Sequence, residues 1–349
     1  MSNNVTHFFG LDYHQDSIQV CVLDGEGKIL INKKVPNSIG ALVVLAEQYG
    51  PVTRAAVEAC AGAPCLVETL RHVHGWKIEQ AHAGYVARMK QSPDKSDYTD
   101  ARILADLARV DYLPVVWSPP KYIRTLRDFV RHRAALVKSR TSEKLRLLAL
   151  LRRNRAKSEH KRWSKDWCLW LSETYQIDED SRWLVLEHLE TILFLNGKIE
   201  TIEARLKKFT ADDPLIGILM KQKNIGPITA WIMRAEIADF SRFKNGKQLS
   251  NFCGLSPRNV SSGNRQATSG LIKSGAPILR CVIIEAAQRL SHGKGDESVL
   301  FNRLHHKNGK PKCVAIAAVA NRWIRKLFHV INAEVRQWAL AKEKETTAA

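Results

Sequence analysis

The sequence lacks the marks of a secreted or membrane-spanning protein. It begins MSNNVTHFF, without the charged start and apolar stretch of a secretory signal. No apolar run approaches the roughly 20 residues that a membrane-spanning helix needs. The longest runs, such as CVAIAAVA, are broken by small residues and are soon followed by Asn321 and Arg322. We therefore expect a soluble, intracellular protein with no membrane partner.

Cysteine pairs are also lacking. The seven cysteines are scattered, odd in number and never spaced as CxxC. This pattern argues against a disulfide framework and against a structural zinc site. Most of the cysteines are expected to be small, buried hydrophobic residues in a reducing compartment.

Negative charge is scarce relative to positive charge. The chain has 35 Asp and Glu residues against 54 Lys and Arg residues, a formal net charge of +19. Residues 121–165 alone hold 16 basic residues and three acids, so 16 − 3 = +13. Charge this concentrated is unfavourable through self-repulsion unless a polyanion neutralises it. The stretch lacks the broad apolar face of an interfacial helix, so nucleic acid is the expected partner rather than an anionic membrane.

The first 115 residues or so predict a compact α/β domain. Three short strands are expected over residues 6–35, followed by alternating strands and helices. The last of these helices lies in SDYTDARILADLARV, where Ser96 is the expected N-cap.

Two long helices are expected next, over about 121–156 and 182–209, each with one apolar stripe. Such stripes favour a coiled coil, antiparallel or between subunits, or two helices of a bundle within one chain. Between them, KRWSKDWCLWLSETY holds three of the nine tryptophans, either as a helical cap or as a surface that stacks on bases. From about residue 212, helical patterns are split by KNIGPITA and by a loop rich in Gly and Ser.

Four carboxylates lie where they can converge. Asp12 and Glu58 each end an apolar strand, which brings them to one edge of a sheet. Asp97 and Asp100 are i and i+3 on a helix, so they share a face. An RNase H-like fold holds a pair of Mg²⁺ ions in this way, because hard cations need anionic oxygen ligands.

Each acid also has an ordinary explanation. Asp12 can simply end a strand, Glu58 can be a surface residue, and the Asp97/Asp100 pair can face the positive end of the helix dipole. Asp106 belongs to no such set and is expected to be a surface acid. The stretch LDYHQDSIQVCVLDGEGKIL also suits the first phosphate loop of actin-like sugar kinases, but no further Gly-rich phosphate loop is evident before residue 217.

Other motifs indicate nucleic-acid contacts. QKNIGPITA resembles the hairpin of a helix-hairpin-helix, whose turn offers backbone N–H groups to a DNA phosphate. Asn224 replaces the usual first glycine there and tolerates a left-handed backbone. The candidate nucleic-acid-binding residues are Lys223, Asn224, Gly226, Lys273, Arg280, Arg131, Arg152 and Arg153.

Serines are dense in the loop 254–275. Most serines in such a loop cap helices or bond to their own turn. A serine nucleophile needs activation, and no histidine lies nearby in the sequence.

Together these residues resemble the DEDD transposases of insertion sequences, the bridge-RNA-guided recombinases that include the pilin-gene invertase. The resemblance covers nearly the whole chain. It is carried by GLDYHQDS, AAVEAC and KSDYTDARILADL near the N-terminus, and by IGPITAWIMRAEIADFSRFKNGKQLSNFCGLSPRNVSSG followed by GLIKSGAPILR. The ending KPKCVAIAAVANRWIR is similar to the subgroup with an A-N-[KR] helix.

The resemblance implies three parts. Residues 1–115 would form a RuvC-like, RNase H-like domain in which Asp12, Glu58, Asp97 and Asp100 hold Mg²⁺ as a two-metal site. Residues 116–211 would be basic coiled-coil helices for dimerisation and nucleic-acid binding, and residues 212–349 a mainly helical transposase domain. In that last part Ser262, just before Gly263, would attack a DNA phosphate and form a phosphoserine link; the adjacent Ser261 is the obvious mis-assignment.

The resemblance also implies partners and a location. These are the DNA of the element ends and target, a structured guide RNA, and further copies of the chain in a homodimer that assembles to a homotetramer, in the bacterial cytoplasm at the nucleoid. Two other functions stay open: a metal-dependent RuvC-like nuclease or junction resolvase in which Ser262 is structural, and a non-enzymatic nucleic-acid-binding protein with decayed acids.

Overall fold

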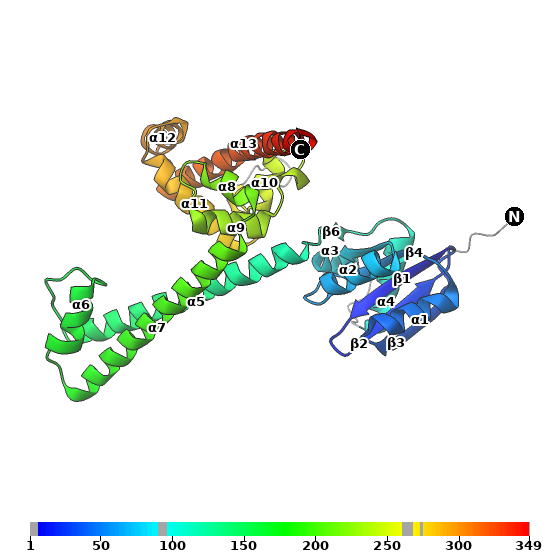
Figure 1. Cartoon of the computed structure of the whole chain (residues 1–349), viewed down its shortest axis with the longest axis horizontal. Coiled ribbons are helices and arrows are strands. Elements are labelled where there is room, and N and C mark those ends of the chain that lie inside the picture. The colour runs from blue at the N-terminus through cyan, green and yellow to red at the C-terminus, as the bar shows by residue number, and fades with distance from the viewer. Residues whose placement is uncertain (1–5, 90–95, 260–267, 273–274, 349) are drawn as a thin grey trace. The chain divides into compact units, whose positions relative to one another are not determined.

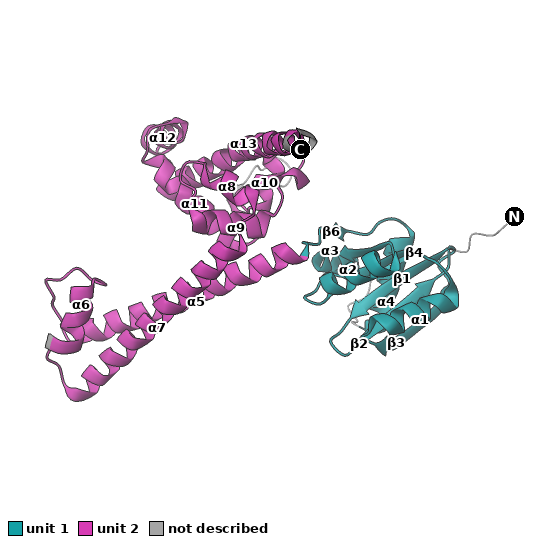
Figure 2. Cartoon of the chain, viewed as in Figure 1, with its two compact units in different colours: residues 1–120 teal, residues 121–349 magenta. Residues whose placement is uncertain are grey.

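The chain forms two units, residues 1–120 and residues 121–349 (Figure 2). The structure is a computed structural model that describes residues 6–89, 96–259, 268–272 and 275–348. The boundary between the two units falls at residue 120. A further division between residues 116–211 and 212–349 stays a prediction.

One mixed sheet of six strands organises the N-terminal unit (Figure 1). Its strand order is β3-β2-β1-β4-β5-β6. The strands are β1 (His7–Tyr13), β2 (Ser17–Leu23), β3 (Ile29–Pro36), β4 (Val52–Glu58), β5 (Ile78–Ala81) and β6 (Val115–Val116). β1, β2 and β3 pair antiparallel, whereas β1, β4 and β5 are parallel, and β6 pairs antiparallel with β5. This arrangement is consistent with the expected RNase H-like domain.

Helices cover both faces of this sheet. Alternate strand residues such as Phe9 and Leu11 are fully buried in a core formed with α1 (Ile39–Tyr49) and α2 (Ala63–His74). The residues between them face α4 (Asp97–Arg109), and α3 (Ala83–Met89) packs on that same side. The period of two along each strand therefore sends successive side chains to opposite layers.

The backbone of α4 lies directly against β1 at Gly10. A Cβ atom on Gly10 would lie 1.9 Å from the carbonyl oxygen of Ala101 and 2.4 Å from the amide nitrogen of Ala105. Only a residue without a side chain permits this approach. The helix start is also set locally, because the Ser96 hydroxyl accepts the N–H of Thr99 at 3.2 Å. The expected N-cap at Ser96 is thus confirmed.

Two long antiparallel helices, α5 (Lys121–Arg153) and α7 (Glu179–Phe209), pair within the C-terminal unit (Figure 1). Arg133 donates to Glu203 at 2.7 Å, and Arg140 donates to Asn196 at 2.9 Å. The partner number falls as the arginine number rises, as antiparallel pairing requires. The two apolar stripes therefore face each other inside one chain. A coiled coil that joins two subunits stays a prediction.

The tryptophan-rich segment folds over the end of this hairpin. It forms α6 (Lys165–Leu169) and a π-helical turn (Trp170–Thr174). Trp167 is buried there among leucines of α5 and Val185 and Ile192 of α7. The segment thus forms a helical cap, and the alternative that its rings also stack on bases stays a prediction.

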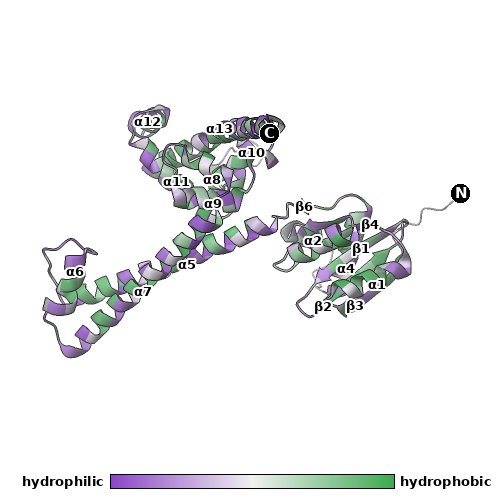
Figure 3. Ribbon diagram, viewed as in Figure 1, coloured by the Kyte–Doolittle hydropathy of each residue, from purple (hydrophilic) through white to green (hydrophobic). Residues whose placement is uncertain are grey.

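The rest of the C-terminal unit is mainly helical. Its helices are α8 (Pro214–Met220), α9 (Pro227–Ile237), α10 (Gly246–Phe252), α11 (Pro277–Ser291), α12 (Asp296–Asn302) and α13 (Lys312–Ala348). Their apolar faces enclose one core, and the residues facing away from it are largely hydrophilic (Figure 3). Two short strands, β7 (Pro257–Asn259) and β8 (Thr268–Leu271), pair inside the expected loop. Sequence reasoning missed them because both strands are short and their residues, PRN and TSGL, do not alternate in polarity.

The expectation for the cysteines was wrong for most of them. Cys21 and Cys253 are buried, but Cys60, Cys65, Cys281 and Cys313 are exposed. Cys65 and Cys281 lie on the outward faces of α2 and α11, where the helical period overrides the average preference of cysteine for burial. Within the described ranges, no helix combines the length and apolar character needed to cross a bilayer.

We expect Gly10→Ala to destabilise the packing of α4. The new methyl group overlaps backbone atoms, which cannot swing away, so the cost is about 1–3 kcal/mol by analogy with overpacked cores. Hydrogen exchange resolved by mass spectrometry should show faster exchange in peptides of α4, a readout that does not require the two units to unfold together.

Gly40→Ala is the matched control. A Cβ on Gly40, in the first turn of α1, meets no heavy atom within 4 Å. This variant should leave α4 unchanged and stabilise α1 by up to about 1 kcal/mol. Equal exchange in α4 for the wild type and Gly10→Ala would contradict the packing described above.

Candidate metal centre

Asp12 and Glu58 end neighbouring parallel strands on the same face of the sheet. Leu11 of β1 pairs with Val57 of β4, so Asp12 and Glu58 are the next residues along each strand. Leu11 and Val57 point into the core under α1 and α2. Because side chains alternate along a strand, Asp12 and Glu58 point to the opposite face, the one that α4 covers.

Asp12 and Asp97 converge on the imidazole of His14. The Nε2 atom of His14 lies 3.2 Å from Oδ2 of Asp12 and 3.3 Å from Oδ1 of Asp97. One ligand atom from each of these three residues lies within 4.8 Å of the others. The Nζ atom of Lys34 lies 3.8 Å from the second oxygen of Asp97. The site therefore joins the carboxyl end of β1 to the first turn of α4.

The acids repel one another. Burial is the main cause that raises the pKa of Asp12, and the nearby charges of Asp100 and Asp97 raise that pKa further, against the opposing effect of His14. Asp100 is itself 95% buried, at 5% exposure. Like charges held together in a partly buried place favour the binding of a cation between them.

The donor set fits a divalent cation. Carboxylate oxygens suit Mg²⁺ or Mn²⁺, and an imidazole nitrogen additionally suits a transition metal. Asp12, Asp97 and His14 are the residues that would hold it. The side chains of His14 and Asp97 are 44% and 41% exposed, so a metal and a substrate can reach them from solvent.

Glu58 and Asp100 are near this group without being members of it. Glu58 is half-buried at the end of β4, and within the described part of the chain its carboxylate forms no hydrogen bond or ion pair. Asp100 lies one turn after Asp97 on α4. The structure therefore brings Asp12 and Asp97 together and leaves the roles of Glu58 and Asp100 as metal ligands a prediction.

His14 was missed by sequence reasoning although a signal existed. It stands two residues after Asp12, and residues i and i+2 of an extended segment share a face. Asp106 was expected to be a surface acid, and it does form an exposed ion pair with Arg109, at 2.7 Å.

The hairpin at residues 221–226 has the geometry expected of a tight turn. Asn224 has a φ angle of 66°, the left-handed conformation for which asparagine is suited. Lys223 is exposed beside it, and Gly226 is the N-cap of α9. Contact of these residues with a phosphate stays a prediction.

The other candidate phosphate-binding residues lie in different settings. Arg131 donates two hydrogen bonds to the buried carboxylate of Glu236, at 3.0 and 3.1 Å, so its charge is already balanced within the chain. Arg152 and Arg153 are exposed at the end of α5. Arg280 has a buried Nη1 atom that bonds to no described residue. Lys273, Ser261 and Ser262 lie outside the described residues.

Comparison with known proteins finds two family matches in the same order as these features. Residues 9–154 match the IS110-type DEDD family described as "Transposase". Residues 217–298 match the family described as "Transposase IS116/IS110/IS902 family".

Individual relatives agree with these matches. The transposase for insertion sequence element IS1111A of Coxiella burnetii is 26% identical over 88% of this chain and 85% of its own length. The transposase for insertion sequence element IS1328 of Yersinia enterocolitica is 25% identical over 92% of this chain and 95% of its own length. The transposase for insertion sequence element IS1533 of Leptospira borgpetersenii is 22% identical over the same shares.

We expect Asp12→Asn to have opposite effects with and without metal. When folding raises the pKa of a carboxyl group, the folded protein becomes less stable as the pH rises through that pKa. The pKa of Asp12 is raised, so its ionised form destabilises the metal-free protein at neutral pH. The amide removes this charge and should raise the melting temperature of the metal-free protein. The wild type should instead gain about 2.7 kcal/mol at a metal concentration 100-fold above its dissociation constant, and the variant should gain little.

Asp106→Asn is the control for this experiment. It removes an exposed acid of α4 that contacts Arg109 and not His14. Thermal melts in EDTA, Mg²⁺ and Mn²⁺ provide the measurement. A metal-dependent shift that Asp12→Asn and Asp106→Asn retain equally would rule out the site at Asp12.

Proposed function

Because the chain belongs to the IS116/IS110/IS902 family of transposases, we propose that it cuts and rejoins DNA through a serine–phosphate intermediate at a metal-assisted site. The family assignment makes it a DEDD-type transposase. The serine, the metal and an RNA guide are the parts of this function that we add to the assignment.

The convergence of Asp12 and Asp97 on His14 is the observation that carries this proposal. It lies in the part of the chain matched to the DEDD family, with a third acid, Asp100, one helical turn away. A cluster of carboxylates on one face of a sheet has little value for stability, because burial and the charges of Asp100 and Asp97 raise the pKa of Asp12. Its value lies in binding a cation next to a phosphate.

A pair of Mg²⁺ ions would be the metal at this site. Asp12 and Asp97 would hold the metal together, and Glu58 and Asp100 would complete the ligand set from the neighbouring strand end and the next helical turn. When bound, such a pair supplies positive charge that activates an attacking oxygen and stabilises the leaving oxygen. His14, whose imidazole would bind a transition metal directly, orients the Asp12 carboxylate through its 3.2 Å contact when the ion is Mg²⁺.

Ser262 is the nucleophile. Its Oγ loses a proton and forms a bond to the DNA phosphorus, while the bond from that phosphorus to one deoxyribose oxygen breaks and the displaced oxygen takes up a proton. Rejoining runs in reverse, with the hydroxyl of another DNA end attacking the phosphoserine. The energy of the phosphodiester is conserved in the covalent link, so no external energy source is needed.

The chain reads its DNA through a structured RNA and works as a homodimer that assembles to a homotetramer. The carboxylates of one subunit act with the serine of another, and base pairing supplies the sequence recognition. The concentrated positive charge of residues 121–165 supports an RNA or duplex backbone as the partner of this region. The setting for this activity is the bacterial cytoplasm.

We expect Ser262→Ala to abolish a covalent protein–DNA adduct. The reaction would contain the protein, Mg²⁺, the RNA encoded beside its gene and a nicked DNA substrate that traps the intermediate. Adduct formation, measured as a shifted band on a denaturing gel, should fall below detection in the variant because alanine has no oxygen nucleophile. Ser261→Ala is the matched control and should retain the adduct.

Each other outcome selects a different function. Mg²⁺-dependent cleavage that survives Ser262→Ala indicates a metal-dependent nuclease or junction resolvase. DNA binding without any cleavage, unchanged by Asp97→Ala, indicates a nucleic-acid-binding protein. Loss of the adduct in Ser261→Ala instead of Ser262→Ala moves the nucleophile by one residue.

A further inference from the structure

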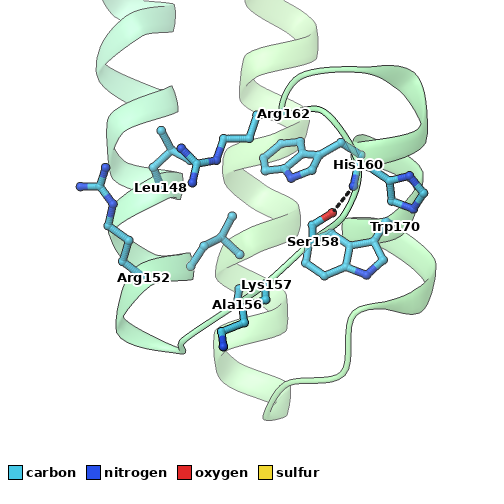
Figure 4. Close-up of a pocket in the computed structure, with 10 residues that line it drawn as sticks. Leu148, Arg152, Ala156, Lys157, Ser158, His160, Arg162 and Trp170 are labelled. Atoms are coloured by element: carbon cyan, nitrogen blue, oxygen red, sulfur yellow. Dashed lines mark hydrogen bonds between the residues drawn. The ribbon is translucent and has the colours of Figure 1, made fainter.

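The end of the α5–α7 hairpin contains a pocket of about 440 Å³ (Figure 4). This volume lies within the ~300–1,000 Å³ that small-ligand sites occupy. One wall is apolar and aromatic, made by Leu148 and Leu151 of α5 and by Trp167 and Trp170 of the cap. The rest of the lining is polar or basic, and we call Arg152, Lys157 and Arg162 its basic rim.

The aromatic wall is held rigidly. Trp167 is 2% exposed and packs at 4.8 Å from the ring of Trp163, whose face in turn carries the Nζ atom of Lys144 at 4.4 Å. The ring of Trp170 is only partly buried and is supported by Tyr175, 4.9 Å away between ring centroids. Figure 4 shows Trp170 beside Ser158 and His160 at the pocket. The pocket thus presents an indole ring already fixed in place.

The basic rim is not neutralised within the chain. In the part of the chain that the structure describes, Arg152, Lys157 and Arg162 form no salt bridge, and the nearby Glu143 pairs with Arg146 and His188 instead. Nearer the base of the hairpin the pattern differs, since Arg131 pairs with Glu236 and Arg133 with Glu203. Residues 141–165 contain nine basic residues and two acids, so 9 − 2 = +7 remains at this end. Such a concentration of free positive charge calls for an anion.

We propose that this pocket binds an unpaired nucleotide of a single-stranded RNA segment. The base stacks on Trp170, and the flanking phosphates lie against Arg152, Lys157 and Arg162. Aromatic rings accept any base face, while arginine and lysine hold the backbone, which is how single-stranded nucleic acids are bound without strong sequence preference. A duplex keeps its base faces stacked inside, whereas RNA loops and bulges expose them.

The choice of RNA as the occupant rests on the guide RNA of the proposed function, but the pocket does not depend on the metal centre or on Ser262. The pocket lies in the C-terminal unit and its lining comes from residues 148–170 alone. Failure of the adduct experiment would leave it intact, and failure of the test below would leave the proposed chemistry intact.

Photo-crosslinking to the full chain tests the proposal. The probe is a 12-nucleotide single-stranded RNA with 4-thiouridine, compared with single-stranded DNA of the same sequence carrying 4-thiothymidine and with the RNA in duplex form. Crosslinked peptides are identified by mass spectrometry, and affinity is measured by fluorescence anisotropy. We expect RNA crosslinks within residues 148–170, and a loss of crosslinking there of about fivefold or more in Trp170→Ala.

A second variant separates recognition from folding. Combining Arg152→Gln, Lys157→Gln and Arg162→Gln keeps the aromatic cap and should weaken both crosslinking and the salt dependence of binding. Lys161→Gln, which removes a charge from the same segment outside the pocket lining, and Trp183→Ala, which removes a 60% exposed ring of α7, are the controls. Circular dichroism melts check that each variant is folded.

The outcomes are distinct. Crosslinks confined to other regions overturn the proposal, as does an equal loss in Lys161→Gln and in the triple variant. Duplex RNA that competes as well as the single strand removes the role of the unpaired base. Crosslinking by single-stranded DNA without crosslinking by RNA overturns the choice of RNA.

Discussion

The approach of α4 to Gly10 of β1 sets the position of the candidate metal centre. With no side chain at Gly10, the carbonyl of Ala101 occupies the space that a Cβ atom would need. The backbone of α4 therefore contacts the backbone of β1 directly, so the distance between the helix and the sheet can vary little. Its first turn carries Asp97, and β1 continues to Asp12 only two residues beyond Gly10. Metal ligands tolerate errors of about 0.2 Å, so their placement rests on this rigid contact.

The same contact creates an electrostatic conflict. It brings Asp97 and Asp100 close to Asp12, whose pKa is raised by burial and by both neighbours. His14 and Lys34 supply some positive charge at the rim of the cluster. Stability alone would favour replacing one of these acids, because ionised carboxylates at close range are unfavourable. Acids whose repulsion lowers the stability of the fold, at a strand end that solvent can reach, are typical of a binding site.

A structural feature could be predicted from the sequence when the residues that determine it are close together in the chain. Alternation along β1, β2 and β4 and the N-cap at Ser96 are local, and they predicted the elements that carry Asp12 and Asp97. The transposase family also followed from motifs that the residues display in order. The balance of Arg131 by Glu236 is not local, because 105 residues separate the partners. Nor does an apolar stripe on α5 reveal whether its partner is α7 or another subunit, since both would bury the same residues.

Positive charge on the described part of the α5–α7 hairpin is paired near its base and largely unpaired at its far end. Near its base α5 enters the core of the C-terminal unit, where Leu126 and Val130 are buried. A charge beside a packed interface must be paired, and Arg127 and Arg131 accordingly meet backbone oxygens or the carboxylate of Glu236. At the other end the helices project into solvent, where water and dissolved ions weaken the repulsion between Arg152, Lys157 and Arg162 without removing it. Leaving these charges without acids reduces the stability of the hairpin end, and the tryptophan cap offsets this by burying Trp167. This segment therefore combines positive charge that no described acid balances with a rigid aromatic wall. A ligand that carries both negative charge and a planar ring, as a nucleotide does, can contact both.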